Sequence, residues 1–468
     1  MVHRLLAWAI SGVIGMSNTE TALTNREWDQ LGFARASNLV SRPTRLAETG
    51  LSETFVADLI AKHLLDRGTL SLGDLSTNLA LAGTIVEGVL NFMRTEARVQ
   101  VRPGQASHAG LAYTLTDRGR VTALDAMMRS GYLGPAPVPL KRYAKIARAQ
   151  TIHKRTVTQD AMRAAFEDVV LDGKMLDRLG PALNSGRAIF IYGRAGTGKT
   201  YISQRLCRLF YQPTLIPHAI AIGDAVVQVF DPLVHKQLQQ RTEDDGLKLE
   251  RGHDPRLVVC ERPVVITGGE LTSEMLEVHY DPSTRLYEAP LQLKANNGMF
   301  VIDDMGRQKI SPETVFNRWI VPMEEKRDYL TLGSGRHFTV PFDVVLIFST
   351  NIHPLQLADE AFLRRIGYKI EFGTLTPAQY EQIWRETCAL HKVEYDPRVL
   401  DYVINELHTK KRVSLLPCHP RDLIGMAVDH AIYEENSRNI DIEHMQWAWE
   451  NYFVSVDEYS QIAGRQAP

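Results

Sequence analysis

The sequence predicts an α/β fold in which helices flank a parallel sheet, with a small α+β domain before the sheet and a helical lid after it. Three apolar runs indicate the sheet: "AIFIY" at 188–192, "GMFVI" at 298–302 and "FDVVLIFST" at 342–350. Such runs are typical of strands buried on both faces, as in a parallel sheet. Strands alternate with helices up to about residue 372, and the remaining residues are largely helical in pattern.

The composition is that of an ordinary globular protein, with 44% hydrophobic and 23% charged residues. The formal net charge is −2, so no overall charge draws the chain to nucleic acid or to an anionic membrane. The four cysteines lie far apart and show no CxxC spacing, which argues against disulfides and cysteine metal sites and fits a reducing, cytoplasmic location. His253 and Cys260 lack a second ligand pair, so we predict no metal site there.

The N-terminal stretch "LLAWAISGVIGM" at 5–16 is apolar, but twelve residues are too few to cross a ~30 Å hydrocarbon core as a helix. We therefore predict no membrane span. The stretch is a signal-peptide core, a buried helix, or sequence upstream of a true start at Met16. The last two are favoured because no small-x-small cleavage site follows, and this leaves open whether residues 1–15 belong to the native protein.

Three helices followed by two strands and a helix are predicted between residues 51 and 133. The helices are "SETFVADLIAKHLLDRG", which ends at Gly68, "LSLGDLSTNLAL" and "TIVEGVLNFMRTEARV", for which Thr84 is the expected N-cap and Glu87 its capping-box partner. The strands are "RVQVR" and "LAYTLT", and "RGRVTALDAMM" is the last helix. Three helices with a two-stranded wing resemble a winged-helix domain, and "YTLTDRGR" looks like its wing strand.

The glycine-rich turn after the first apolar run satisfies the pattern G-x-x-x-x-G-K-[ST]: Gly193, Arg194, Ala195, Gly196, Thr197, Gly198, Lys199 and Thr200. It follows a buried strand and precedes "KTYISQRLCRLFY", which has helical spacing. Glycines let successive backbone N–H groups converge on phosphate oxygens, and a helix N-terminus adds positive potential. The turn is therefore predicted to cradle nucleotide phosphates, with Lys199 on the β- and γ-phosphates and Thr200 on Mg²⁺.

The other two apolar runs end in polar residues suited to the same site. "GMFVI" leads into Asp303 and Asp304, and "FDVVLIFST" leads into Asn351. A carboxylate at a strand end beside the phosphate loop completes a Mg²⁺ site, which is the role predicted for Asp303. Asp304 is predicted to orient or activate the attacking water. Asn351 is predicted to hydrogen-bond the γ-phosphate or that water, although Asn at a strand end also serves turns.

With these motifs in order, the chain resembles the AAA+ ATPases over about residues 170–450. The resemblance makes 193–200 the Walker A motif, 301–304 Walker B and Asn351 sensor 1. "DEAFLRRIGYKI" looks like the arginine-finger segment, with Arg365 the better match and Arg364 next, and "CHPRDLIGMA" looks like the sensor 2 helix, with Arg421 reaching the phosphates. The resemblance implies ATP and Mg²⁺ as ligands, with residues 193–201 and Arg421 binding nucleotide. No NKxD-type motif is evident, so ATP is favoured over GTP.

Residues 291–306 and 321–351 are similar to MoxR-like (helix-2-insert) and sigma-54-activator ATPases. The pattern predicts a hairpin at 329–340 and a strand–turn–strand at 218–231, and Thr376 with Pro377 opens the lid. Most relatives carry Glu where this chain has Asp304. A carboxylate shorter by one methylene holds water less well, so slow turnover is expected.

The expected segments follow from these patterns: an irregular arm at 1–50, a winged-helix-like domain at 51–133, a linker and helical approach at 134–169, an AAA+ α/β domain at 170–372 and a helical lid at 373–468. The linker prediction rests on the three prolines of "GPAPVPL" at 134–140.

The resemblance also implies a homo-oligomeric ring, with a hexamer expected, because the arginine finger serves the neighbouring subunit's site. Simple ion pairing is the alternative for Arg364, Arg365 and Arg421, the last with Asp422 or Glu443.

Three functions remain open: a chaperone-like ATPase that remodels or assembles a partner protein, a DNA-associated ATPase regulator, and a slow ATP-dependent switch. Arg94 and Arg98 are accompanied by Glu87 and Glu96, which disfavours DNA. Tyr280 and Tyr287 belong either to substrate loops or to packing between subunits.

Overall fold

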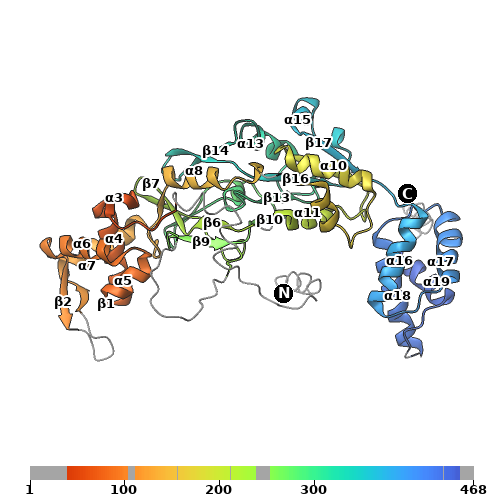
Figure 1. Cartoon of the computed structure of the whole chain (residues 1–468), viewed down its shortest axis with the longest axis horizontal. Helices are drawn as coiled ribbons and strands as arrows, with labels where there is room; N and C mark the ends of the chain where they lie inside the picture. The colour runs from red at the N-terminus through yellow and green to blue at the C-terminus, as the bar shows by residue number, and fades with distance from the viewer. Residues whose placement is uncertain are drawn as a thin grey trace, which may run out of the picture.

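The computed structural model describes residues 40–103, 111–154, 156–210, 212–238, 253–435 and 437–453. The molecule is elongated: a mainly helical N-terminal region lies at one end, an α/β region in the middle and a helical lid at the other end (Figure 1). The apolar stretch at 5–16 lies outside the described residues. Within the described residues, no helix is long and apolar enough to cross a membrane.

The N-terminal region contains the three predicted helices as α4 (Glu53–Arg67), α5 (Leu72–Leu79) and α6 (Gly83–Thr95). Strands β2 (Val99–Pro103) and β3 (Leu111–Leu115) follow, and then α7 (Asp117–Arg129). A two-residue strand that the sequence did not predict, β1 (Leu70–Ser71), joins them in a sheet of order β1-β3-β2. The apolar stripes of α4, α5 and α6 meet in one buried core with β3.

Local sequence explains where two of these helices begin and end. Ser52 caps α4 by accepting a hydrogen bond from the Phe55 N–H, and Gly68 ends the helix with a φ of 82°. The predicted capping box at Thr84 is wrong, because the N-cap of α6 is Ala82, two residues earlier. The Thr84 hydroxyl instead donates to the Thr44 carbonyl at 3.3 Å. Thr84 therefore joins α6 to the segment before α4.

Residues 40–50 and the proline-rich segment both pack against the α/β region. Val40 is buried beside Val138, and α3 (Leu46–Thr49) follows it. Within 134–140, β4 (Val138–Pro139) pairs in parallel with β7 (Ala219–Ile222). The Arg142 side chain of α8 (Leu140–Ala149) donates to the carbonyls of Ser41 and Glu48. These contacts fix both segments to the body of the molecule.

A second, mixed sheet has the order β11-β12-β8-β7-β4. It contains the predicted strand–turn–strand as β7 and β8 (Ala225–Gln228), and a hairpin of β11 (His279–Asp281) and β12 (Leu286–Glu288). Two antiparallel pairs lie close by: β6 (Thr214–Pro217) with β9 (Leu257–Cys260), and β14 (Arg327–Thr331) with β15 (His337–Pro341). The latter pair is the predicted hairpin at 329–340.

The central sheet is parallel throughout and has the order β10-β13-β16-β5-β17. Its strands are β5 (Ile189–Gly193), β10 (Val264–Thr267), β13 (Met299–Ile302), β16 (Val345–Thr350) and β17 (Tyr368–Phe372). The predicted α/β fold class with a parallel sheet is thereby confirmed.

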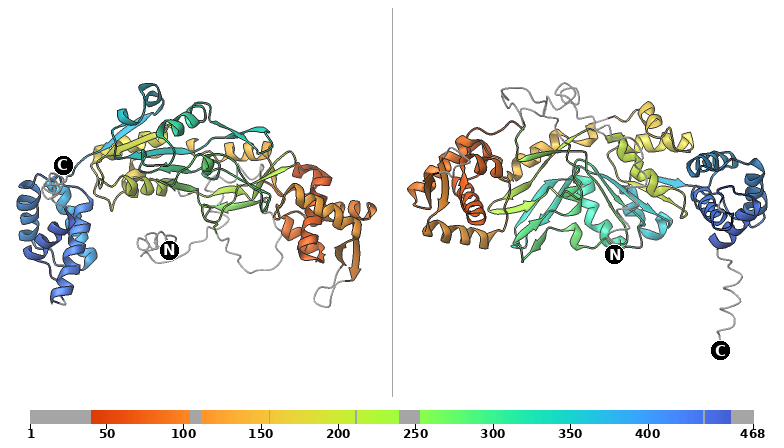
Figure 2. Two further views of the ribbon diagram at one scale, coloured as in Figure 1. Left: turned by 180° about the vertical axis from the view of Figure 1, so that it is seen from behind. Right: turned by 90° about the horizontal axis from the view of Figure 1, so that it is seen from below.

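Helices cover both faces of this sheet, as Figure 2 also shows. Phe190 and Phe348 face a core shared with α13 (Pro312–Glu325) and α15 (Glu360–Arg365). Ile189 and Ile347 face the opposite core, which α10 (Gly173–Asn184) and α11 (Lys199–Leu206) complete. The apolar runs are continuous because alternate side chains enter two different cores. The short helices α9 (Gln159–Ala165), α12 (Leu291–Lys294) and α14 (Pro354–Leu357) lie in the connections.

The lid follows β17 and consists of α16 (Pro377–His391), α17 (Pro397–Tyr402), α18 (Cys418–Glu435) and α19 (Ile442–Tyr452), with a π-helical turn at Val403–Thr409. Thr376 is the N-cap of α16 and forms a capping box with Gln379, while Pro377 occupies the first turn, as predicted. Trp384 and Trp449 are buried in a lid core separate from those of the central sheet. Figure 1 shows the lid beside the end of the molecule that carries α11.

Candidate functional site

Three adjacent strands of the central sheet bring the predicted site residues together. β13, β16 and β5 are neighbours in parallel register, so their carboxyl ends lie on the same edge. Beyond these ends follow Asp303, Asn351 and the glycine turn, respectively. The carboxyl edge of a parallel sheet is the usual place for a ligand in open α/β folds.

The glycine turn has a backbone that only glycine accepts at low cost. Gly193, Gly196 and Gly198 have φ values of 147°, 83° and 83°. A Cβ at Gly193 would lie 2.2 Å from the Phe372 carbonyl oxygen of β17. Gly198 is the N-cap of α11, so the turn leads directly into a helix N-terminus. The Thr197 hydroxyl closes the turn by donating to the Arg194 carbonyl at 2.9 Å.

The Lys199 side chain lies folded back over this turn. Its ammonium group donates to the carbonyls of Gly193 at 3.0 Å and Arg194 at 2.8 Å, and to Asn351 Oδ1 at 2.6 Å. The residue is only 6% exposed. Burial lowers the pKa of Lys199, and the negative charges of Asp303 and Asp304 oppose that shift. A cation thus occupies the place where phosphate oxygens are expected.

Thr200 and Asp303 form the predicted metal pair. The Thr200 hydroxyl donates to Asp303 Oδ2 at 2.5 Å, and the Asp304 backbone N–H donates to Asp303 Oδ1 at 3.0 Å. The Asp303 backbone N–H in turn donates to the Thr267 carbonyl of β10 at 2.7 Å. A hydroxyl and a carboxylate at hydrogen-bond distance are oxygen ligands of the kind that Mg²⁺ takes, together with water and substrate phosphates. The donor set therefore fits Mg²⁺.

Asp304 and Asn351 complete the cluster. Asn351 Nδ2 donates to Asp304 Oδ1 at 2.9 Å, while its Oδ1 accepts from Lys199. Asp304 has a φ of 48°, a left-handed conformation that is strained for a residue with a side chain. The Gln308 side chain supports this turn by donating to the Asp303 and Asp304 carbonyls at 2.8 and 3.0 Å. Gln308 was not predicted from the sequence, because a glutamine beyond the strand end carries no pattern of its own.

The lid contacts the glycine turn at two places that the sequence also did not indicate. Arg194 Nη1 donates to Ser414 Oγ at 3.0 Å. A Cβ at Gly196 would lie 2.5 Å from Cys418 Sγ, at the start of α18. Ser414, in the connection before α18, and Cys418, at the start of α18, thus both lie against the glycine turn. This packing leaves residue 196 with no room for a side chain.

The three predicted arginines are held by acidic neighbours. Arg421 Nε lies 3.4 Å from Asp422 Oδ1 and its side chain is 73% exposed, which matches the alternative interpretation as an ion pair. Arg365 Nε lies 2.5 Å from Glu324 Oε1 of α13. Arg364 lies 3.4 Å from Glu360 and is 80% exposed. Both finger candidates end α15, which projects from the central region in Figure 1.

Tyr201, in the first turn of α11, is half-exposed next to the loop. Its hydroxyl accepts a hydrogen bond from Arg205 Nη1 at 2.9 Å, and the same guanidinium lies over its ring at 5.6 Å. Arg205 also pairs with Asp168 and donates to the Ala165 carbonyl, so it ties α11 to the segment before α10. Ala195 completes the predicted loop between Arg194 and Gly196.

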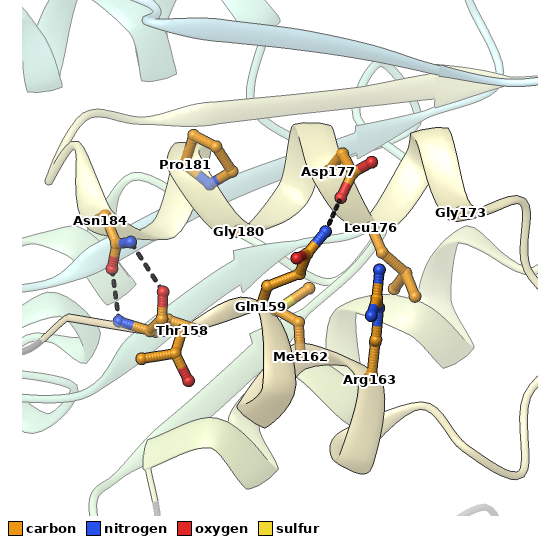
Figure 3. A pocket seen from close by; sticks show the side chains of 11 residues that line it. Thr158, Gln159, Met162, Arg163, Gly173, Leu176, Asp177, Gly180, Pro181 and Asn184 are labelled. Carbon is orange, nitrogen blue, oxygen red and sulfur yellow. Dashed lines mark hydrogen bonds between the residues drawn. The ribbon is translucent and has the colours of Figure 1, made fainter.

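A cavity of about 230 Å³ lies between α9 and α10, away from these residues in sequence (Figure 3). Met162 and Leu176 give it an apolar wall, and Gln159 donates to Asp177 at 3.0 Å across it. Its lining residues all fall between 157 and 184. It therefore includes none of the predicted site residues.

Comparison with known proteins gives a partial family match and remote structural likenesses. The model of a domain of unknown function (DUF8689) matches residues 376–451, which is the lid. No curated protein sequence matches the chain. Among solved structures, a mutant of RuvB from Thermotoga maritima is 12% identical with a TM-score of 0.37, covering 61% of this chain and 71% of that one.

Two further solved structures are similar to the same extent. The FIGL-1 AAA domain in complex with ADP is 13% identical, with a TM-score of 0.32 over 66% of this chain and 85% of that one. NtrX from Brucella abortus is 10% identical, with a TM-score of 0.37 over 66% of this chain and 58% of that one. Likenesses of this size do not assign a family or an activity to the chain.

Proposed function

We propose that the chain binds ATP with Mg²⁺ at the glycine turn and hydrolyses it. One observation carries the proposal: Lys199, Thr200, Asp303, Asp304 and Asn351 form a continuous set of hydrogen bonds at the ends of three adjacent strands. Phosphoryl transfer depends mainly on positioning and on neutralising charge, and a lysine, metal ligands and a water-orienting carboxylate supply both.

Each residue of this cluster has a proposed role. Lys199 exchanges its contacts with the Gly193 and Arg194 carbonyls for phosphate oxygens, while Thr200 and Asp303 hold the metal. Mg²⁺ held by these two residues would supply positive charge that offsets the negative charge developing on the phosphates. Asn351 already bridges Lys199 and Asp304, so it links the phosphate-binding cation to the water-orienting carboxylate.

Turnover is expected to be slow for two reasons. Asp304 is one methylene shorter than glutamate, and its carboxylate is engaged with Asn351. A carboxylate misplaced by about 1 Å costs on the order of 10²-fold in rate. If the chain is a slow switch, Asp304→Glu will turn over faster than the native protein.

A ring is proposed because the resemblance assigns the arginine finger to the neighbouring subunit's site, and both candidate arginines lie at the end of α15. Arg365, the preferred finger, must leave Glu324 to serve a neighbouring subunit, whereas Arg364 is already exposed. A head-to-tail contact repeated by rotation closes a ring, and a hexamer is the expectation. An arginine inserted at the transferred phosphoryl group contributes about 10³–10⁵ in rate.

A protein client is favoured over DNA. The N-terminal elements run helix, strand, two helices and two strands, which supports the winged-helix-like proposal. However, Arg98 and Arg118 both lie 3.7 Å from Glu96, and Arg98 also lies 3.9 Å from Asp58. These acids offset the charge of two of the basic residues that a DNA contact would use. The tilted rings of Tyr280 and Tyr287 lie with centroids 4.7 Å apart on a hairpin whose turn contacts Gly131 of the N-terminal region.

The test combines turnover with assembly. Steady-state ATP hydrolysis is measured for the native chain and Arg365→Ala, with and without duplex DNA, and the mass of the nucleotide-bound particle is measured by sedimentation. The proposal predicts Mg²⁺-dependent hydrolysis in a particle larger than a monomer, loss of rate in Arg365→Ala and no stimulation by DNA. Hydrolysis by a monomer at an unchanged rate in Arg365→Ala would refute the ring, and strong stimulation by DNA would favour the DNA-associated alternative.

A further inference from the structure

Two histidines and a glutamate of the lid lie together where α18 ends and α19 begins. His430 and Glu434 are one turn apart on α18, and His444 is in the first turn of α19. One ring nitrogen of each histidine and one carboxylate oxygen of Glu434 all lie within 4.8 Å of one another. We call these three side chains the lid cluster. It is separate from the proposed nucleotide site and independent of the proposed hydrolysis.

The histidines of the lid cluster have buried nitrogens without hydrogen-bond partners. His444 Nε2 and His430 Nδ1 are both buried and unpaired, and the His444 side chain is only 5% exposed. The other His430 nitrogen, Nε2, lies 3.5 Å from Glu434 Oε1. Buried polar atoms in native structures almost always have a partner, so an unpaired nitrogen on each histidine of one cluster indicates a missing ligand.

A carboxylate outside the lid cluster orients one of the histidines. Asp441 Oδ1 lies 2.7 Å from His444 Nδ1, so that nitrogen carries the proton and Nε2 keeps its lone pair. Metal-binding histidines almost always donate their second N–H to a carboxylate or carbonyl in this way. Asp441 is fixed in turn, because it is the N-cap of α19 and accepts from the His444 backbone N–H at 3.0 Å.

His430 is held by packing instead. Its ring stacks on Trp447 of α19 with centroids 4.0 Å apart and an interplanar angle of 11°, and its centroid lies 5.4 Å from that of His444. Glu434 is 53% exposed and can move. Two rigid ligands and one adjustable ligand, with two of the three spaced i, i+4 on one helix face, form the type of arrangement found in zinc sites.

We propose that the lid cluster binds one divalent transition-metal ion of the zinc type, through His430, Glu434 and His444. Two imidazoles and one carboxylate favour zinc-like ions over Mg²⁺ or Ca²⁺, which prefer oxygen ligands only. Ligands at about 2.0–2.1 Å around a tetrahedral ion are roughly 3.3 Å apart, so the three ligand atoms, which lie within 4.8 Å of one another, need to approach by no more than about 1.5 Å. Three protein ligands leave a fourth position for water. The ion ties α18 to α19 within the segment 376–451 that the family model matches.

Cobalt titration of the full chain tests this proposal. The protein is stripped with chelator and titrated with Co²⁺ in excess Mg²⁺, which occupies oxygen-only sites but does not compete for imidazole. The expected result is one Co²⁺ per chain with the intense visible bands of four-coordinate cobalt, bleached when Zn²⁺ is added. Absence of these bands, or bands that Zn²⁺ does not bleach, would overturn the proposal.

Four variants separate the lid cluster from nonspecific binding. His444→Gln and Glu434→Gln should lose the bands, and Glu434→Gln is safe for folding because its side chain is exposed. Asp441→Ser keeps an N-cap oxygen but removes the carboxylate behind His444, so affinity should fall about 10- to 100-fold. Glu443→Gln, an exposed change in α19 next to His444, should bind Co²⁺ like the native chain. Equal affinity in Glu434→Gln and Glu443→Gln would overturn the proposal.

Thermal unfolding supplies a readout that does not depend on cobalt. Zn²⁺ should raise the midpoint of lid unfolding in the native chain and in Glu443→Gln, and should leave Glu434→Gln unchanged, because an ion that binds only the folded lid stabilises it. A zinc-induced shift of the same size in all three proteins would show that the ion binds elsewhere.

Discussion

The edge of the parallel sheet and the lid each hold a cluster of polar side chains, but the two differ in how their hydrogen bonds are satisfied. At the sheet edge, Lys199 has three acceptors, and Asn351 uses both of its amide atoms. In the lid cluster, two buried imidazole nitrogens have no partner. The polar groups at the sheet edge are thus satisfied by the protein itself, because backbone carbonyls and Asn351 accept from the Lys199 ammonium group. For the lid cluster, the proposed ion would supply the missing contacts.

The largest expected effect comes from a variant that removes Lys199 from the hydrogen-bonded cluster at the sheet edge. Lys199→Ala removes the cation that bridges the loop carbonyls and Asn351. We expect ATP turnover to fall about 10²- to 10³-fold, the loss typical of removing one preorganised electrostatic contact to the transition state. Initial-rate phosphate release measures it, and Lys174→Ala, at an exposed position on α10, is the control. Turnover within twofold of the native rate in Lys199→Ala would contradict the assigned role.

A pair of glycine variants measures how closely the lid packs on the loop. Gly198→Ala meets no atom within 4 Å, so it isolates the cost of a side chain at a φ of 83°, about 1–2 kcal/mol. Gly196→Ala has the same φ but also places a Cβ 2.5 Å from Cys418 Sγ. We expect a larger loss of stability in urea unfolding for Gly196→Ala.

The double variant Gly196→Ala/Cys418→Ala distinguishes contact from backbone strain. Removing the thiol should reduce the loss of stability caused by Gly196→Ala toward the loss caused by Gly198→Ala, because the clash is with the sulfur atom. Equal losses of stability in Gly198→Ala, Gly196→Ala and the double variant would mean that the lid does not pack against the glycine turn in solution.

The lid is expected to lose stability in acid. Burial lowers the pKa of His419 to about 4, with repulsion from His408 adding to the shift and Asp422 opposing it. The unfolded chain, with an ordinary histidine pKa near 6.5, then binds more protons than the folded lid. Stability from this neutral histidine is present above about pH 6.5 and declines as the pH falls toward 4. Urea unfolding followed by tryptophan fluorescence should show the decline in the native chain and in the exposed-site control His279→Gln, and less of it in His419→Gln.

The smallest effect concerns the ion pair that restrains Arg365. Glu324→Gln removes a partner that is 51% exposed, so the free energy of unfolding should change by less than about 1 kcal/mol. Because the change weakens the hold of its own subunit on Arg365, ATP turnover of the assembled protein should not fall. A marked drop in turnover would show that Glu324 positions the arginine rather than restrains it.

Sequence patterns predicted the parallel sheet and the residues at its edge because those signals are local. The glycine turn is contiguous, and Asp303 and Asn351 each follow an apolar run directly. The contributions of Gln308 and Ser414 could not be predicted, because each depends on a turn or a lid position that exists only in the folded chain. Thr84 is not the predicted cap, because α6 begins after Ala82 and the Thr84 hydroxyl donates to the Thr44 carbonyl, a contact that exists only in the folded chain.

The lid cluster was missed for a related reason. Sequence spacing draws attention to the cysteines and to His253, whose Nε2 lies 3.2 Å from the Leu257 carbonyl. His430, Glu434 and His444 belong to two helices, and only the packing of α18 on α19 brings the second histidine to the first pair. The domain boundaries, the winged-helix-like assignment and the ring stay predictions.

The most direct test of the account is equilibrium binding of ATP to the nucleotide-free chain, with Mg²⁺ and with chelator, for the native protein and for Thr200→Val. Valine keeps the shape of threonine but removes the hydroxyl that donates to Asp303. The account predicts one ATP per chain, tighter binding with Mg²⁺ in the native protein, and loss of that Mg²⁺ dependence in Thr200→Val. No binding by the native chain, or the same Mg²⁺ dependence in both proteins, would contradict it.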